Sequence, residues 1–388
     1  MRVPMSSPDL TDAERQAVLG VLRTPRLSMG PELEAFEREL TRRVGARYAI
    51  GVSSGTSGLH LAVRAAGVAD GDFVITTPFS FVASANVILY ERAVPVFVDV
   101  DPETGNMNPD LVSRAAADLS AGGPSARGWL PRRGASEAGP PRAMLVVDVF
   151  GQPAEYERLR KAVEGQGLAL IEDSCEALGA AYRGRPAGTL GDVGVFGFYP
   201  NKQITTGEGG AVVTDRQDWA DRMRAMANQG RAPGDTWLEH TYLGFNYRLD
   251  ELSAALGRVQ LQRLDELMTK REQVAEWYER RLVEIPGVEA PRTIASTTRR
   301  SWFVYVVRLD PGIERRSLAE RLEASGIPTR PYFSPIHLQK YFREAFDYRE
   351  GDLPVAEDLG RRSLALPFSS VMTEEQVETV CQALRGAL

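Results

Sequence analysis

A single lysine stands between an apolar run and a glycine-rich turn in GFYPNKQITTGEGGAVV, residues 197–213. The letters GVFGFY before it predict a buried strand, so Lys202 would lie where that strand ends. In open α/β sheets, ligands bind at the carboxyl ends of the strands. A lysine that is partly desolvated there loses proton affinity and becomes a nucleophile. The alternative is an ordinary solvated lysine on the surface.

A second candidate is SSGTSGL, residues 53–59, which leads from a short apolar strand into a helix. Glycine lets the backbone approach an anion closely. The free N–H groups of a helix start, together with the hydroxyls of Thr56 and Ser57, could bind a phosphate. A Ser/Gly-rich turn between a strand and a helix is also a common structural cap. Taken alone, this segment favours the cap.

A third candidate, IEDSCEALGA at residues 171–180, ends an apolar strand with acidic side chains. Asp173 could be a carboxylate that is fixed at the strand end and directed at a ligand. Alternatively, Asp173 caps a helix and Glu176, three residues later, completes a capping box. Taken alone, this segment also favours the cap.

Together the three segments supply the parts of a site for pyridoxal phosphate. A lysine forms a Schiff base with the aldehyde, an acid keeps the pyridinium nitrogen protonated, and a helix start neutralises the phosphate. An aromatic ring stacked on the cofactor would fit as well, and TTPFSFVASAN offers Phe79 and Phe81. The alternative for both phenylalanines is packing in the core.

The elements that must position these residues alternate between strand and helix. DFVITT, FVASANVILYE and VPVFVDV predict a strand, a helix and a strand, and a further helix is expected around residues 154–165. This order, with nearly continuous apolar strands, predicts an α/β fold with a mostly parallel sheet flanked by helices. Residues 248–282 are amphipathic and charged, which predicts one long helix that could connect two domains. We therefore expect a large domain at 1–249 and a smaller α/β domain at 250–388.

Residues 118–142 do not fit a compact fold, because they are rich in Gly, Pro, Ala, Ser and Arg. The stretch is longer than ordinary connections. Its composition predicts a mobile surface insertion, with a lid over the site as the second interpretation.

Composition excludes several classes of function. The chain has 388 residues and a net charge of −6, which argues against a nucleic-acid-binding surface. No apolar run is long enough to span a membrane, and the cytoplasm is the expected location. Two cysteines and three widely spaced histidines argue against a disulfide framework and against a metal site.

With these segments in place, the chain resembles the DegT/DnrJ/EryC1/StrS family of sugar aminotransferases, which are fold-type I pyridoxal-phosphate enzymes. The resemblance covers nearly the whole chain and rests on SSGTSGLHLAV, TTPFSFVASAN, VPVFVDVDPETGNMNP, IEDSCEALGAAYRGRPAGTLGDVGVF, YPNKQITTGEGGAVVTD and LGFNYRLDELSAALG. It implies that Lys202 is the Schiff-base lysine and that Asp173 meets the pyridine nitrogen. It further implies that Gly55, Thr56 and Ser57 hold the phosphate.

The resemblance implies three more contacts. Phe81 would stack on the cofactor ring, and Glu176 would lie near its phenolic oxygen. Asn246, in GFNYR, would reach the phosphate of the neighbouring subunit of a homodimer, whose active sites are built across the interface. One departure stands out, because the family often has a phosphate-binding serine where this chain has Gly197.

Glu176, FYPNKQITTGEGG and RPYFSPIHLQKYF look most like the GDP-perosamine synthase branch of the family. That branch aminates C-4 of a GDP-linked 4-keto-6-deoxy hexose, a step in surface polysaccharide (O-antigen) or glycoside biosynthesis. The amino donor is expected to be L-glutamate, which leaves as 2-oxoglutarate, with pyridoxamine phosphate carrying the amine between the half-reactions. Arg231, Tyr332 and His337 are candidate sugar or nucleotide contacts. For each of them a structural hydrogen bond or a surface charge is the alternative.

The sequence fits other functions less well. A dTDP- or UDP-linked 3- or 4-keto sugar is the alternative substrate. The related sugar 3-dehydratases carry histidine in place of the lysine, so Lys202 argues against them. A ligand sensor without catalysis is disfavoured because Lys202 and Asp173 are both present. A dinucleotide-dependent oxidoreductase is disfavoured because GEGGAV is not GxGxxG and leads into a strand.

Overall fold

A computed structural model describes residues 3–135 and 139–388. A seven-stranded sheet has the order β1-β9-β8-β5-β4-β2-β3. Its strands are β1 (Tyr48–Val52), β2 (Phe73–Thr76), β3 (Val94–Phe97), β4 (Ala143–Val147), β5 (Ala169–Asp173), β8 (Val193–Gly197) and β9 (Gly210–Thr214). Strands β8, β5, β4, β2 and β3 run parallel, whereas β9 runs antiparallel to both of its neighbours. The mostly parallel sheet expected from the apolar strands is confirmed.

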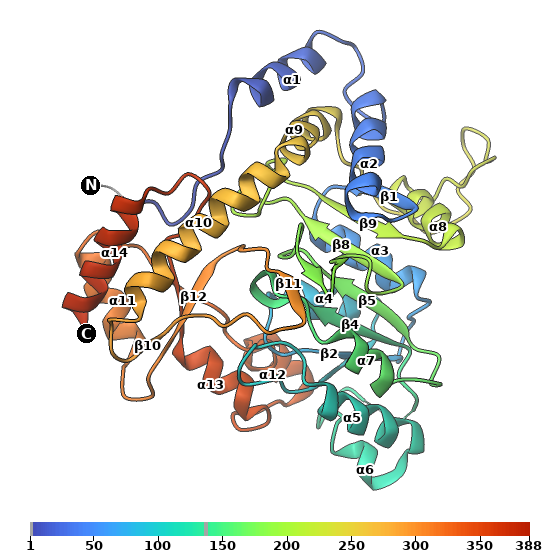
Figure 1. The fold of residues 1–388 in the computed structure, drawn as a ribbon. Helices are drawn as coiled ribbons and strands as arrows, with labels where there is room; N and C mark the ends of the chain where they lie inside the picture. The colour runs from blue at the N-terminus through green and yellow to red at the C-terminus, as the bar shows by residue number, and fades with distance from the viewer. Residues whose placement is uncertain (1–2, 136–138) are drawn as a thin grey trace.

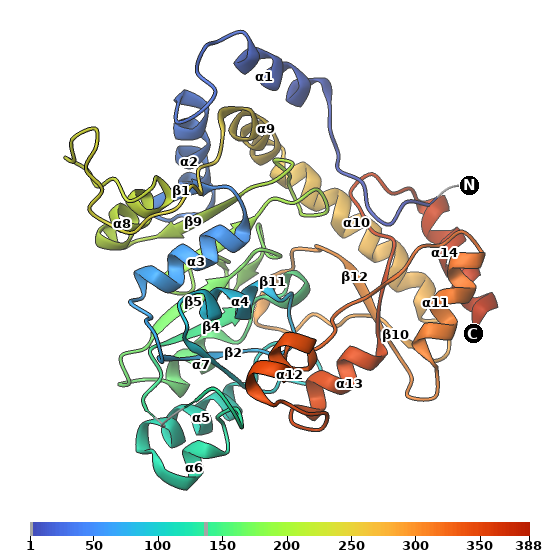
Figure 2. The same ribbon diagram turned by 180° about the vertical axis from the view of Figure 1, so that it is seen from behind.

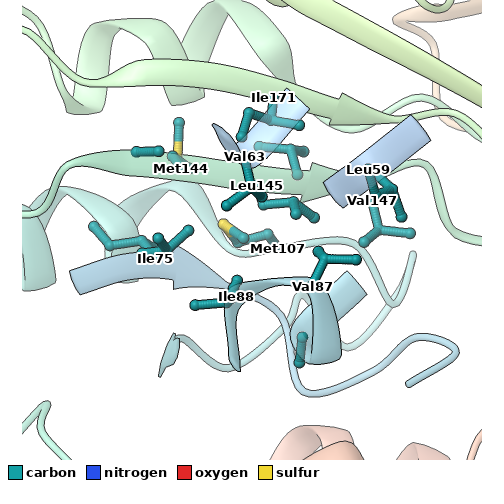
Figure 3. Close-up of a cluster of buried hydrophobic side chains, with 14 of the residues drawn as sticks. Leu59, Val63, Ile75, Val87, Ile88, Met107, Met144, Leu145, Val147 and Ile171 are labelled. Carbon is teal, nitrogen blue, oxygen red and sulfur yellow. The ribbon is translucent and has the colours of Figure 1, made fainter. Parts of the chain in front are cut away.

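Helices cover both faces of this sheet (Figures 1 and 2). They are α2 (Pro31–Val44), α3 (Gly55–Ala65), α4 (Ala83–Tyr90), α5 (Pro109–Ala121), α6 (Gly123–Arg127), α7 (Tyr156–Ala162) and α8 (Gln217–Ala227). Figure 3 shows the core between the sheet and α3 and α4, where Leu59, Val63 and Ile88 meet Leu145 and Ile171. Burying these side chains is the main stabilising contribution, at about 25 cal/mol per Å² of apolar surface.

A smaller four-stranded sheet, β10-β12-β14-β13, is built by the C-terminal part of the chain. It consists of β10 (Val288–Glu289), β12 (Tyr305–Leu309), β13 (Arg330–Pro331) and β14 (Ser363–Leu366). The helices of this part are α9 (Glu251–Gln262), α10 (Leu264–Leu282), α11 (Arg315–Ala324), α12 (Lys340–Phe346), α13 (Pro354–Arg362) and α14 (Glu374–Ala387). The long helix expected over 248–282 is therefore two helices, which meet at Arg263.

The two halves of the chain interleave. In a third sheet, β11 (Thr297–Arg299) pairs with β6 (Ala181–Tyr182), which pairs with β7 (Arg185–Pro186). At the other end, Val3 lies in the core of the C-terminal part, before α1 (Asp12–Leu22) begins. The domain division at 249/250 stays a prediction.

Arg263, between α9 and α10, ties the N-terminal segment to the body of the molecule. Its guanidinium lies 2.8 Å from Asp9 and 2.7 Å from Glu14. Burial raises the pKa of Glu14, but hydrogen bonds from Thr11 and Arg263 outweigh it and lower this pKa to about 2.

Much of the expected mobile insertion at 118–142 forms helix or is held by side-chain contacts. The expectation of a loop over the whole segment is therefore wrong. Its first residues end α5, and α6 follows at once. Trp129 Nε1 then donates a 2.8 Å hydrogen bond to Asp118. Arg132 forms a two-point ion pair with Asp352, with N–O distances of 2.6 and 2.7 Å. Residues 136–138 of the segment lie outside the described residues.

No helix in the described part of the chain is both long and apolar enough to cross a membrane. Within the same residues, no group of three or more His, Cys, Asp and Glu side chains is arranged to hold a metal ion.

Candidate active site

A cavity of about 440 Å³ opens where β5 and β8 end and α3 begins. The predicted site residues that line it are Gly55, Thr56, Phe81, Asp173, Glu176, Lys202 and Tyr332. Segments from five regions of the sequence thus meet at the edge of the sheet that the strand order predicts for ligands.

Lys202 lies in the turn after β8, and its side chain is only 15% exposed. Its backbone N–H donates to the carbonyl of Tyr199 at 2.9 Å. The Nζ atom lies 3.6 Å from Glu176 Oε1 and 3.7 Å from the centre of the Phe303 ring. The alternative of a solvated surface lysine is therefore wrong.

Asp173 is the last residue of β5 and is almost fully buried. Ser84 Oγ donates to Asp173 Oδ2 at 2.7 Å, and the N–H of Cys175 donates to Oδ1 at 3.2 Å. No helix follows Asp173, so the capping-box alternative is wrong. The two donors instead fix a carboxylate that borders the cavity.

Glu176 is the acid nearest to Lys202. Its Oε2 accepts a 3.0 Å hydrogen bond from the N–H of Phe150. Burial raises the pKa of Glu176, and the neighbouring ammonium of Lys202 only partly offsets that effect. A carboxyl group with a raised pKa beside a lysine is suited to exchanging protons with it.

A layer of buried polar groups lies next to Asp173, whose backbone carbonyl accepts a 3.1 Å hydrogen bond from the N–H of Asp148. Asp148 Oδ1 accepts from Tyr156 at 2.9 Å and from the N–H of Ala154 at 3.0 Å. Ser174 Oγ lies 2.7 Å from Asp148 Oδ2 and 2.8 Å from Glu172 Oε1. Because a hydroxyl has one proton to donate, one of these carboxyls must itself be protonated. Burial raises the pKa of both carboxyls, and the charge of Glu172 adds to the effect on Asp148, so the pair holds one proton between them.

The start of α3 forms a cradle for an anion. Ser54 caps the helix by accepting from the N–H of Ser57 at 3.0 Å, so the structural cap expected as the alternative is present. The Ser57 hydroxyl is engaged by Ser53 and Ser54 at 2.9 and 2.8 Å. The N–H groups of Gly55 and Thr56 have no acceptor within their helix, as at any helix start, and remain for a ligand.

Glycine at 55 is required by close packing. A Cβ there would fall 2.7 Å from Cys175 Sγ. Glycine at 210 is required as well, because its Cβ would fall 2.7 Å from the backbone nitrogen of Gly55. By contrast, a Cβ on Gly197 would meet Cys175 at 3.4 Å, an ordinary contact.

The two phenylalanines of TTPFSFVASAN differ. Phe81 is 63% exposed and borders the cavity, whereas Phe79 is buried. Phe79 packs edge-on against Phe150 and Phe333, with ring centres 5.9 and 5.7 Å apart. The core alternative therefore holds for Phe79, and Phe81 is left as the ring that can face a ligand.

Three predicted residues lie away from this cavity. Arg231 lines a different cavity and stacks on Trp237, with its guanidinium 4.7 Å from the ring centre. Asn246 is exposed in the loop after α8. His337 is fully buried and its Nε2 lies 3.1 Å from Glu357 Oε1. The structural alternative therefore describes His337 better than a substrate contact does.

Sequence reasoning missed several residues of the site. Ser84 and Cys175 stood inside quoted motifs, but nothing in their residue type indicated a contact with Asp173. Phe303 lies just before β12, more than 100 positions from Lys202 in the sequence. Only the tertiary fold brings its ring to the lysine.

The residues present fit pyridoxal phosphate. A partly buried lysine, a hydrogen-bonded carboxylate, a free helix start and an exposed aromatic ring surround one cavity. These are the groups that the aldehyde, the pyridinium nitrogen, the phosphate and the ring face of this cofactor require.

Comparison with known proteins agrees with this assignment. The model of the DegT/DnrJ/EryC1/StrS aminotransferase family matches residues 8–385. GDP-perosamine synthase of Caulobacter vibrioides is 36% identical over 391 residues, which cover 100% of this chain and 98% of that protein. The spore coat polysaccharide biosynthesis protein SpsC of Bacillus subtilis is 32% identical, and the match covers 99% of this chain and 96% of that protein.

A solved structure agrees as well. The crystal structure of a DegT DnrJ EryC1 StrS aminotransferase from Brucella abortus matches with a TM-score of 0.86 and 31% identity, covering 97% of this chain and 95% of that chain. The fold expected from the resemblance is confirmed.

Proposed function

The chain belongs to the DegT/DnrJ/EryC1/StrS family as a pyridoxal-phosphate-dependent nucleotide-sugar aminotransferase, and we propose that it aminates C-4 of a GDP-linked 4-keto-6-deoxy hexose. The amino donor is L-glutamate, which leaves as 2-oxoglutarate. The observation that carries the sugar assignment is the full-length likeness to a GDP-perosamine synthase.

A second cavity supports a substrate larger than an amino acid. It has a volume of about 680 Å³ and shares Phe81, Tyr199, Asn201 and Tyr332 with the Lys202 cavity. Arg330 lies on its wall and could meet a diphosphate. The keto carbon of a nucleotide sugar could thus enter the Lys202 cavity while its diphosphate and base stay in the larger one.

The cofactor supplies a carbonyl for covalent attachment and a ring that takes up electrons from the bond being broken. In the proposed site, Asp173 holds the pyridinium nitrogen in its protonated form. Gly55 and Thr56 bind the phosphate through their N–H groups, with the positive end of the α3 dipole behind them. Phe81 covers the ring face and shields it from water.

Lys202 both anchors the cofactor and moves protons. Lys202 Nζ would form the covalent link to the cofactor, and when free of that link it would take the proton from Cα of the amino donor as a base and give it back as an acid. Glu176, 3.6 Å away, accepts and returns the proton as Nζ changes charge. The same groups act in reverse when the keto sugar enters, so ping-pong kinetics are expected.

We further propose a homodimer with shared active sites. The loop after α8 extends away from the body of the molecule (Figures 1 and 2). It exposes apolar side chains, with Trp237 77%, Leu238 81% and Leu243 74% exposed. An apolar patch of this kind is typical of an interface. In this arrangement Asn246, from the same loop, reaches the partner's phosphate, and the cytoplasm stays the expected location.

The lysine role is tested with purified protein. Wild type reconstituted with pyridoxal phosphate should be yellow, should lose that colour with glutamate, and should trap the cofactor on Lys202 after borohydride reduction. Lys202→Ala should bind the cofactor without covalent trapping and should not transaminate. Lys340→Ala, an exposed lysine, is the matched control. Full transamination by Lys202→Ala would refute the role.

The substrate is tested by incubating the enzyme and glutamate with GDP-, dTDP- and UDP-linked keto sugars and identifying the products by NMR. Amination at C-4 of the GDP-linked 4-keto-6-deoxy hexose is the expected result. Preferential amination of a dTDP- or UDP-linked sugar would refute the nucleotide assignment and leave the aminotransferase in place.

A further inference from the structure

Arg271 of α10 is a buried arginine without an acidic partner. Arg271 is 2% exposed, and among the described residues no acidic side chain forms an ion pair with it. Burying a guanidinium without compensation is expensive. Four backbone carbonyls compensate here, and they come from two segments that are far apart in the sequence.

Each of the two terminal nitrogens of the guanidinium donates to one of the two segments, which are residues 201–202 and residues 302–303. Nη2 donates to the carbonyls of Lys202 at 2.7 Å and Asn201 at 3.4 Å. Nη1 donates to the carbonyls of Trp302 at 3.0 Å and Phe303 at 3.2 Å. Because the guanidinium is flat and rigid, it fixes the distance between these two segments.

Both segments define the position of the Lys202 amine. One carries its side chain, and the other carries the Phe303 ring, which lies 3.7 Å from Nζ. The carbonyls that Arg271 holds therefore belong to the lysine itself and to the residue that its amine contacts. A change in the spacing of the segments would move Nζ relative to the cavity.

We propose that Arg271 is a positioning residue for Lys202, which holds the amine at the place where the covalent bond to the cofactor forms. This inference rests on the proposed role of Lys202 as the cofactor anchor. Arg271 touches neither cavity and acts only through the two backbone segments that it joins.

Lysine cannot replace Arg271 in this role. An ammonium is a point charge on a flexible stem, so it can reach one pair of carbonyls but cannot span both. Arg271→Lys keeps the charge and most of the volume and removes the bridge. Arg271→Gln removes the charge as well, and provides a second variant if the first does not fold.

Arg300 is a matched control. It is also buried, and it donates to the carbonyl of Arg292 at 3.1 Å and stacks 4.2 Å from the centre of the Trp302 ring. Burial lowers the pKa of both arginines to about 10. No hydrogen bond joins Arg300 to residues 201–202 in the described chain. Arg300→Lys thus reports the general effect of disturbing a buried arginine.

The experiment compares two forms of the cofactor on the apoprotein. Pyridoxal phosphate can bond to Lys202, whereas pyridoxamine phosphate carries an amine and cannot. In Arg271→Lys the Kd for pyridoxal phosphate should rise by about tenfold, as expected for the loss of one or two hydrogen bonds of a charged group. In the same variant, the Kd for pyridoxamine phosphate should change by less than about threefold. Arg300→Lys should leave the ratio of the two Kd values unchanged.

A second measurement needs no cofactor. Trace acetylation of the apoprotein, read by mass spectrometry, should label Lys202 at a different rate in Arg271→Lys than in wild type, with Lys340 as the internal standard. The inference is overturned if Arg271→Lys weakens the binding of both cofactor forms by the same factor. It is also overturned if Arg300→Lys changes the ratio of the two Kd values as much as Arg271→Lys does. If wild type does not trap the cofactor on Lys202, the proposed function fails instead, and the two failures are distinguishable.

Discussion

Replacing Gly197 with serine should strengthen the binding of the cofactor phosphate. Gly197 ends β8 beside the start of α3, and its φ is not in the left-handed region, so a side chain is allowed. The added Cβ would lie 3.4 Å from Cys175 Cβ and 3.5 Å from its Sγ. The site therefore accepts the added Cβ without displacing its neighbours.

The size of the effect follows from one new hydrogen bond. A hydrogen bond to a charged group contributes about 1.5–3 kcal/mol, and ordering the hydroxyl opposes part of it. We expect a gain of about 1.4 kcal/mol, which is a tenfold lower Kd for pyridoxal phosphate.

Fluorescence titration of apoprotein with pyridoxal phosphate and with pyridoxal separates the phosphate from the ring. Gly197→Ser should tighten only the phosphorylated form, and Gly197→Ala, which adds the Cβ alone, should tighten neither. An equal gain for pyridoxal, or a loss with both ligands, would show that position 197 does not face the phosphate and would refute the reasoning.

Three further outcomes follow from the site and its supports. Gly55→Ala should weaken cofactor binding, because its Cβ would fall 2.7 Å from Cys175 Sγ, and adding Cys175→Ala should restore part of the affinity in the same titration. Asp148 binds its proton more tightly in the folded than in the unfolded state, so its contribution to stability falls as pH rises above its ordinary pKa of 3.8. Asp148→Asn mimics the protonated acid, so its free energy of unfolding, measured by urea titration, should gain on that of wild type between pH 4 and 7 by up to about 1.4 kcal/mol per pH unit; parallel curves of this free energy against pH would contradict this. The pH dependence of the stability that Glu14 contributes has the opposite sign, because its pKa is lowered from 4.5 to about 2 in the folded state. The stability that it adds is present above pH 4.5 and is lost as pH falls towards 2, and Arg263→Gln should reduce that acid-dependent loss in thermal melts.

The fold was largely predictable because its signals are local. Continuous apolar strands alternating with amphipathic helices indicated the parallel sheet, and the sheet edge indicated where Lys202 and Asp173 would meet. Two expectations failed for physical reasons. Arg263 interrupts the predicted 248–282 helix without glycine or proline to mark the break. The Gly/Pro-rich insertion begins in helices, because Trp129 and Arg132 anchor it through contacts that no local pattern reveals.

The parts of the site that the sequence could not reveal are those that depend on distant backbone. Arg271 reads as one more charge on an amphipathic helix, and only burial against four carbonyls distinguishes it from its exposed neighbours. His337 shows the converse, since a histidine that the RPYFSPIHLQKYF motif offered as a substrate contact is fully buried against Glu357.

Gly197 shows how the site can hold a phosphate without the serine that the family often has. Gly55 can pack closely against Cys175 only because it carries no side chain, since a Cβ there would fall 2.7 Å from Cys175 Sγ. This close packing brings the free N–H groups of the α3 start against the ends of β5 and β8. Backbone donors and the helix dipole are the same in every sequence, so a cradle built from them tolerates the loss of one hydroxyl. In the proposed dimer, Asn246 of the neighbouring copy would add a further contact to the same phosphate.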